Sequence, residues 1–224
     1  MATRPRRTGI SDNTEYLASA MEHRLWLAAD PLVLASKSAA RRALLEAAGI
    51  PVGVQPADID ERAVEADAAA DGPSAVAMLL ARAKALAVAN RMPGRLVLGA
   101  DQTLALAAQR FSKPADRAAA AAQLRALRGQ THALHSALSV VCDGEVLFAY
   151  ADAARLTMRA FSDEFLENYL DAAGSAVIAS VGGYQLEGLG IQLFERIEGD
   201  YFSILGLPLL PLLNFLRQQS YLGR

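Results

Sequence analysis

Short apolar runs alternate along the chain with segments in which apolar residues recur at helical spacing. The run at 32–36 predicts a buried strand, and the segment 39–48 predicts a helix that Gly49 ends. Asp143-Gly144, between two further apolar runs, is the strongest short-range signal for a β-hairpin. The pattern also predicts helices at 75–90 (capped by Ser74), at 115–127, from Ser162 to about 172 and from Pro208. Two short strands are expected within 95–108, separated at Gly99–Thr103, and another strand at 191–198. The segment 52–73 is expected to be mostly loop, and 182–190 is a Gly-rich stretch.

Strands and helices therefore alternate, with one antiparallel hairpin, which indicates an α/β fold with a mixed sheet. The chain has 224 residues, 53% hydrophobic and 21% charged, so a substantial core can form. We expect residues 1–30 to be a flexible, polar arm, because the arginines near its start are followed by no apolar signal-peptide segment. Residues 31–224 then form the folded domain, and Met21 is an alternative start.

Composition excludes several classes of protein. A net charge of −2 argues against a protein that coats nucleic acid. The one cysteine, Cys142, excludes an internal disulfide framework and fits a reducing, cytoplasmic compartment. No apolar run reaches the roughly 18 residues of a membrane helix, so no membrane partner is expected.

The first candidate site is the turn between the first strand and the first helix. A helix N-terminus offers free N–H groups to an anion, and the hydroxyls of Ser36 and Ser38 can add donors. Arg41 stands in the first helical turn, where the helix dipole disfavours a cation unless an anion lies between them. The alternative is that Ser38 is an ordinary N-cap and Arg41 a solvated side chain.

Three more charged residues stand in apolar or turn surroundings. Asp101 follows an apolar run at the end of an expected strand, where a carboxylate needs a partner or a metal; otherwise it caps a turn. Lys84 lies close to the apolar face of a helix, from which a lysine usually reaches water. Lys113 precedes Pro114 and can contact a phosphate, or remain in solvent.

A fourth candidate is Glu187, which lies in the Gly-rich stretch 182–190. Glycines there allow close approach of a ligand to the backbone, and the carboxylate can accept two hydrogen bonds from the edge of a base. A mobile loop with a solvated glutamate is the alternative. His132 and His135 stand three apart on an expected strand and face opposite sides, so they form no metal pair.

Together these pieces resemble the Maf family of nucleotide pyrophosphatases over residues 32 to 216. The order and spacing of the motifs carry the resemblance, which rests on LASKSAARRALLEAAGI, DIDE at 58–61, ARAKA at 81–85, LGADQT at 98–103, SKP at 112–114, LRGQTHALHSAL at 127–138, YQLEGLGIQLFERIEGDY and GLPL at 206–209.

The resemblance implies an elongated mixed sheet flanked by helices, two lobes with a central cleft, and a homodimer. It implies hydrolysis of a nucleoside triphosphate between the α and β phosphates with a divalent metal, Mg²⁺ or Mn²⁺. The residues that it places around the phosphates are Ser36, Ser38, Arg41, Lys84 and Lys113. It assigns Asp101 and Glu61 to the metal or the attacking water, with Asp101 as proton acceptor.

Three positions bear on the base. Gln102 and Glu187 resemble the branch that acts on 7-methyl-GTP rather than the branch that prefers dTTP and UTP. Ala40 departs from both, because the family has an arginine or an aromatic residue there, and Ser180 replaces a frequent lysine. A nucleotide-binding regulator of cell division or septum formation, with little turnover, remains the alternative from another class. Retention of both Asp101 and Glu61 favours the enzyme.

Overall fold

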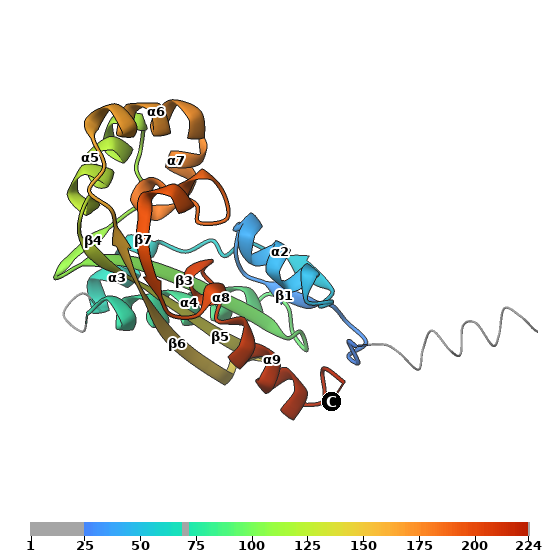
Figure 1. Ribbon diagram of the computed structural model, residues 1–224. Helices are drawn as coiled ribbons and strands as arrows, with labels where there is room; N and C mark the ends of the chain where they lie inside the picture. Colours follow the sequence, from blue (N-terminus) through green and yellow to red (C-terminus); the bar gives the residue numbers. More distant parts are fainter. Residues whose placement is uncertain (1–24, 69–71, 224) are drawn as a thin grey trace, which may run out of the picture.

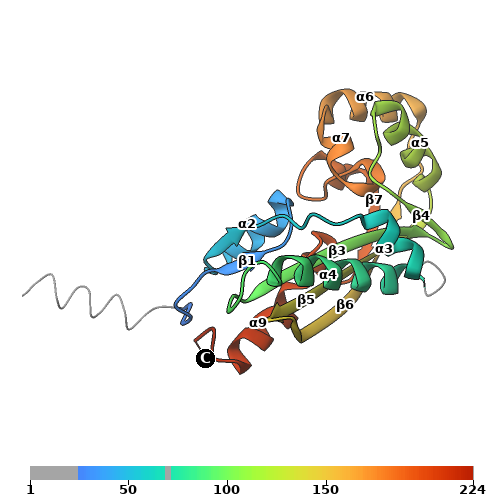
Figure 2. The ribbon, with the colours of Figure 1, turned by 180° about the vertical axis from the view of Figure 1, so that it is seen from behind.

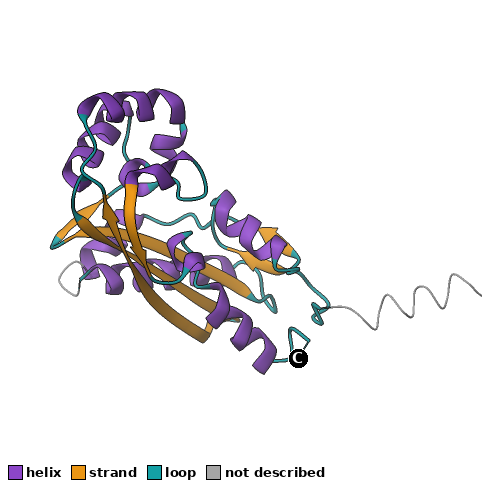
Figure 3. Cartoon of the chain, viewed as in Figure 1, coloured by secondary structure: helices purple, strands orange, loops and turns teal. Residues whose placement is uncertain are grey.

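In a computed structural model, which describes residues 25–68 and 72–223, the chain forms a mixed β-sheet flanked by helices (Figures 1 and 3). The strands are β1 (Leu32–Leu34), β2 (Val52–Val54), β3 (Val97–Leu106), β4 (Gln109–Phe111), β5 (Thr131–Cys142), β6 (Glu145–Met158) and β7 (Phe194–Glu198). The helices are α2 (Ala39–Ala47), α3 (Glu61–Ala68), α4 (Pro73–Ala89), α5 (Arg117–Leu127), α6 (Asp163–Ala173), α7 (Ala176–Ala179), α8 (Tyr201–Ile204) and α9 (Leu209–Gln218).

Among the described residues the strands form one seven-stranded sheet in the order β2-β1-β3-β5-β6-β7, with β4 beside β3. β1 is parallel to β2 and to β3, and all other pairs are antiparallel. The expected hairpin is present, since Cys142 pairs with Glu145 across the turn at Asp143-Gly144. The prediction of an α/β fold with a mixed sheet is confirmed.

The expected break in the third strand has a different form. β3 runs without interruption from Val97 to Leu106, so the prediction of two short strands is wrong. On one side β5 pairs with residues 97–105. On the other side β1 pairs only with Val97 and Leu98, and β4 only with residues 104–106. Residues 99–103 therefore have no strand partner on that side within the described chain, and this free edge faces a cleft.

The segment 52–73, expected to be mostly loop, contains β2 and α3. Asp60 caps the N-terminus of α3, because its side chain accepts hydrogen bonds from the backbone N–H groups of Arg62 and Ala63. Ser74 does not cap α4: the helix begins one residue earlier, at Pro73, where proline's fixed φ and missing N–H suit the first helical position.

Other boundaries moved by a few residues. Asp116 caps α5 by accepting from the Ala119 N–H at 2.8 Å, so this helix begins at Arg117. The expected strand at 191–198 begins only at Phe194, because Leu189–Leu193 form a short 3₁₀ turn. Pro208 stands at the N-cap of α9 rather than at its first position, and the pattern did not predict β4 or α8.

Two hydrophobic clusters divide the molecule into lobes that share the long strands. One cluster lies between α5, α6 and the sheet and includes Leu124, Met158 and Leu170. The other joins β1, α2 and α9 and includes Leu34 and Leu216. In Figure 1 the first lobe lies at the top and the second at the lower right. Figure 2, seen from behind, shows that α3 and α4 cover the face of the sheet that is turned away from the viewer in Figure 1.

The described part of the expected arm is packed. Trp26 is 5% exposed, forms a bridge with Leu222 and stacks on Tyr221. Most of the arm, residues 1–24, lies outside the described residues. None of the helices within residues 25–68 and 72–223 is long and apolar enough to cross a membrane.

Candidate active site

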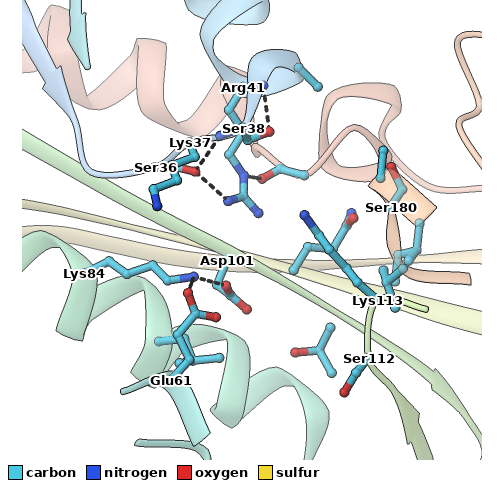
Figure 4. A pocket seen from close by; sticks show the side chains of 18 of the residues that line it. Ser36, Lys37, Ser38, Arg41, Glu61, Lys84, Asp101, Ser112, Lys113 and Ser180 are labelled. Carbon is cyan, nitrogen blue, oxygen red and sulfur yellow. Dashed lines mark hydrogen bonds and ion pairs between the residues drawn. The ribbon is translucent and has the colours of Figure 1, made fainter. Parts of the chain in front are cut away.

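A cavity of about 1060 Å³ opens along the free edge of β3 (Figure 4). It is lined from separate segments, within 35–41, 56–65, 101–103, 110–113, 179–187 and 204–206, and by Leu80, Lys84 and Leu134. All the site residues that the sequence singled out line it, namely Ser36, Ser38, Ala40, Arg41, Glu61, Lys84, Asp101, Gln102, Lys113 and Glu187. The fold therefore brings together residues that lie up to about 150 positions apart in the chain.

The two serines contribute hydroxyl groups whose oxygens already accept bonds. Ser38 caps α2, because its Oγ accepts from the Arg41 N–H at 3.3 Å. The Oγ of Ser36 accepts from the Ser38 N–H at 3.2 Å and from Arg41 Nη1 at 3.3 Å. Since both oxygens act as acceptors, both hydroxyl protons are left to donate to a ligand in the cavity.

Arg41 is held by the protein and not by solvent. Its Nε donates to the carbonyl of Gly206 and its Nη1 to the carbonyl of Ala100, both at 2.8 Å. Burial lowers the pKa of Arg41, and the charges of Asp101 and Glu61 oppose that shift. The sequence left a bound anion or a solvated side chain as the two explanations for Arg41. The side chain is buried, and main-chain carbonyls from two distant segments satisfy much of its fork.

Lys84 joins the two candidate carboxylates. Its Nζ lies 2.6 Å from Asp101 Oδ1 and 3.0 Å from Glu61 Oε1. The side chains of Lys84 and Asp101 are only 10% and 12% exposed, whereas that of Glu61 is 52% exposed. Lys84 is the one charged residue on the buried face of α4, and it reaches the carboxylates instead of solvent. A charge buried in this way is stable only because it is paired.

The donor set fits a divalent cation that also binds a ligand's phosphates. Lys84 contacts one oxygen of each carboxylate, which leaves Asp101 Oδ2 and Glu61 Oε2 outside these ion pairs. Mg²⁺ typically binds one or two carboxylates and completes its shell with water and phosphate oxygens. Within the described residues no group of three or more His, Cys, Asp or Glu side chains is placed to hold a metal ion.

Three further predicted residues stand at the cavity wall. Lys113 is exposed and its side chain enters the cavity from the side opposite Ser36, near Ser180 (Figure 4). Glu187 is exposed at the rim and lies in the turn before Leu189–Leu193. Ala40 is half-buried on the first turn of α2 and lines the cavity.

The side-chain amide of Gln102 donates its hydrogen bonds to groups of the protein itself. Its Nε2 donates towards Ser136 Oγ and the Ile204 carbonyl, both at 2.9 Å, and towards the Ser203 carbonyl at 3.1 Å. An amide NH₂ has two hydrogens, so these three acceptors use its whole donor capacity. Gln102 lines the cavity but presents no free N–H to a base.

Sequence reasoning missed a buried pair behind the cavity wall. His132 Nε2 lies 2.7 Å from the hydroxyl of Tyr184, which lines the cavity. Burial lowers the pKa of His132 to about 4 and raises that of Tyr184, so both are neutral at pH 7. The sequence signal was present, because His132 and Tyr184 stand in two of the quoted motifs, but their long-range contact was not.

The fold and the cavity define a class, an α/β protein whose two lobes enclose an open, charged cleft at the free edge of a mixed sheet. A family model described as "Maf-like protein" matches residues 31–219, and the chain belongs to this family. The predicted resemblance is confirmed.

Two curated relatives illustrate the similarity. The nucleoside triphosphate pyrophosphatase of Rhodopseudomonas palustris (strain BisB18) is 57% identical over 199 residues, covering 89% of this chain and 98% of the relative. The 7-methyl-GTP pyrophosphatase of Rhizobium johnstonii is 54% identical over 189 residues, covering 84% and 95%. Among solved structures, a HAM1 protein from Coxiella burnetii is 14% identical with a TM-score of 0.46, covering 84% of this chain and 98% of its own.

Proposed function

We propose that the chain is a nucleoside triphosphate pyrophosphatase that cleaves the α–β phosphoanhydride bond and releases a nucleoside monophosphate and pyrophosphate. The observation that carries the proposal is the Lys84 contact with both Glu61 and Asp101, inside a cleft that Ser36 and Arg41 also line. Relatives at 54–57% identity that are named for this activity support it.

The residues divide the chemistry between them. The serine hydroxyls, Arg41 and Lys113 bind and orient the phosphate oxygens and stabilise charge that develops on them. Asp101 accepts a proton from the attacking water, whose oxygen forms the new bond to phosphorus as the bridging P–O bond breaks. Lys84 fixes the orientation of Asp101 through their 2.6 Å ion pair.

Asp101 and Glu61 would hold the divalent metal, Mg²⁺ or Mn²⁺. When bound, the metal would neutralise phosphate charge and complete its shell with phosphate oxygens and water. The same proposal includes the homodimer that the resemblance implies, which light scattering of the purified chain tests directly. It also places the protein in the cytoplasm, consistent with its single cysteine.

A chromatographic assay with Mg²⁺ tests the reaction. Wild type is offered the standard nucleoside triphosphates and 7-methyl-GTP, and Asp101→Asn serves as the matched control. We expect monophosphate plus pyrophosphate from wild type, and loss of turnover in Asp101→Asn with nucleotide binding retained. Binding without turnover in wild type would support the nucleotide-binding regulator instead, and release of inorganic phosphate alone would contradict the cleavage site.

We infer a preference for a guanine-type base such as that of 7-methyl-GTP, with dTTP and UTP as the second candidates. Glu187 at the rim can accept two hydrogen bonds from a guanine edge, and an anionic acceptor also suits a methylated, cationic base. Glu187→Gln should therefore shift the ranking of kcat/KM values towards pyrimidine triphosphates. An unchanged ranking would remove Glu187 from base selection.

A further inference from the structure

A row of polar side chains crosses the sheet directly beneath α8. Gln102 on β3, Ser136 on β5 and Asp152 on β6 are register partners, so they stand side by side on one face. Each contributes to hydrogen bonds with Ser203 or its neighbour on α8. We call these four residues, Gln102, Ser136, Asp152 and Ser203, the α8 anchor.

The anchor bonds are short and shielded. Ser203 Oγ donates to Asp152 Oδ2 at 2.7 Å, and Ser136 Oγ donates to the Ser203 carbonyl at 2.6 Å. Ser136 and Ser203 are 0% and 1% exposed. Gln102 adds its bonds to the carbonyls of Ser203 and Ile204. Hydrogen bonds removed from water in this way, one of them to a carboxylate, are expensive to break.

α8 depends on such contacts because it is only four residues long. A single helical turn is not stable in isolation, since its nucleation cost exceeds what so few bonds return. Asp200 caps the turn by accepting from the Ser203 N–H at 2.9 Å, but a cap does not fix where the turn lies on the sheet. The anchor does, because its three other members belong to adjacent strands.

The position of α8 determines one wall of the cleft. Ile204, Leu205 and Gly206 follow from the anchored residue and line the cavity. Gly206 has φ +92°, a conformation that favours glycine, and its carbonyl accepts from Arg41 Nε at 2.8 Å. The anchor is thus connected through three residues of backbone to the guanidinium that faces the candidate phosphate site.

We propose that Asp152, acting through Ser203, is a positioning residue that sets the wall 204–206 and thereby nucleotide affinity and base preference. Ser136, Asp152 and Ser203 do not themselves line the cavity, so they act without touching the nucleotide. Gln102 then influences the base by placing this wall and not by a donor contact. The proposal rests on the proposed function for its catalytic consequence, but the anchoring of α8 can be measured without turnover.

The first measurement is hydrogen exchange of the free protein. The amides of Ile204, Gly206 and Leu207 are bonded to carbonyls within 200–203, so their exchange reports on α8. In Asp152→Ala we expect these amides to exchange at least about tenfold faster, while strand amides keep wild-type rates. Unchanged exchange at α8 would overturn the anchor whether or not the chain hydrolyses nucleotides.

The second measurement is the kinetics of the same variants. Asp152→Ala should raise KM about five- to tenfold with kcat within about twofold, and change the purine-to-pyrimidine ratio of kcat/KM. Asp152→Asn retains an acceptor for Ser203 and should restore most of the wild-type KM. Glu145→Ala, which removes an exposed carboxylate from the start of the same strand, should behave as wild type.

A double-mutant cycle closes the test. Asp152→Ala and Ser203→Ala remove the same bond from opposite ends, so their effects on KM should not add. If Asp152→Ala does not fold, Ser203→Ala carries both measurements, because it keeps the main-chain bonds of α8. Additive effects, or a faster-exchanging α8 with wild-type KM and base ranking, would overturn the proposal. No hydrolysis by wild type would contradict the proposed function and leave the exchange result to decide the anchor.

Discussion

Lys84 places a positive charge between two carboxylates, those of Asp101 and Glu61. Without this lysine the two acidic groups would face each other with no cation of the protein between them. Asp101 is nearly as buried as Lys84, so removing the ammonium leaves an uncompensated charge with little access to water. Breaking this buried ion pair therefore lowers the free energy of unfolding far more than breaking an exposed pair, because solvent screens the charges of an exposed pair.

We therefore expect Lys84→Met to lower the free energy of unfolding by about 3 kcal/mol at pH 7. Arg42→Met is the matched control, since it breaks an exposed pair with Glu46 on α2 and should cost less than about 0.5 kcal/mol. Urea denaturation measures both. Equal stability of the two variants would show that the Lys84 ion pairs contribute no more than a surface pair.

His132 makes stability depend on pH. Its pKa is about 4 in the folded protein because burial disfavours the charged ring, against about 6.5 in the unfolded chain. Above pH 6.5 both states are neutral and the residue has no effect. As pH falls from 6.5 to 4 the unfolded chain binds a proton that the folded protein does not, so unfolding becomes easier.

Over that window the contribution amounts to about 3 kcal/mol of unfolding free energy. His132→Gln cannot titrate, so the stability of wild type should fall more steeply than that of the variant between pH 6.5 and 4. Chemical denaturation at several pH values measures the two slopes. His135→Gln, at a less buried ring, should change the slope less, and parallel curves for wild type and His132→Gln would contradict the low pKa.

At the residue scale the sequence identified the members of the site but not their bonds. Asp101 and Lys84 stand out because each places a charge in apolar surroundings, and Ser36 because its hydroxyl can add a donor beside a helix N-terminus. Arg41 stands out because a cation in the first helical turn needs an anionic partner, but the acceptors that the structure gives it are the carbonyls of Ala100 and Gly206. A carbonyl carries no residue-specific signal, so no reading of side chains could have named them.

At the scale of elements, the site depends on how closely α4 approaches β3. A side-chain Cβ at Gly99 would lie 2.0 Å from the Ala81 carbonyl oxygen and 2.7 Å from the Ala85 nitrogen. Only glycine fits between these two elements. Asp101, two residues after Gly99, and Lys84, directly before Ala85, form the buried ion pair. The Ala81 oxygen and the Ala85 nitrogen both belong to the backbone of α4, so no flexible side chain can move aside to relieve the contact.

Gly99→Ala should therefore lower the free energy of unfolding by about 3 kcal/mol or more. It should also reduce activity, because the new methyl group pushes α4 away from β3 and so separates Lys84 from Asp101. Gly53→Ala is the control: it lies in β2, where a Cβ meets nothing within 4 Å. We expect that variant to change stability by less than about 0.5 kcal/mol. Denaturation midpoints give the comparison, and similar midpoints for the two variants would mean that α4 and β3 separate without cost.

Element types were predictable where periodicity was long and caps were standard, as in α2, α5, α6 and the β5–β6 hairpin. Boundaries were less so, because Pro73 and Ser74 both carry N-terminal signals and the structure uses the proline. The apparent break at 99–103 is informative in hindsight. A polar interruption in an apolar run predicts the end of a strand, but here it marks the stretch where β3 loses a partner on one side and faces the cleft.

At the scale of the whole molecule, β5 and β6 pass through both lobes, while the cleft between the lobes is lined by short segments from each. Ser36 and Arg41 belong to the lobe of β1 and α2, whereas Lys113 lies between β4 and α5 of the other. The fold class followed from the order of elements, but the cleft depends on strand register across long sequence separations, which local patterns do not encode.

A nucleotide that contacts both lobes should stabilise them as one unit. With Mg²⁺ and an α,β-methylene triphosphate at one hundred times its Kd, linkage predicts a gain of about 2.7 kcal/mol and a Tm higher by about 5–10 °C for a chain of this size. Calorimetry should show one transition that moves as a whole, and the corresponding nucleoside should move it far less because it lacks the phosphates. Lys113→Met should reduce the shift by weakening the contact with the second lobe. A transition that splits in two, with only the part containing Ser36 and Arg41 stabilised, would show instead that the nucleotide binds one lobe and leaves the other free.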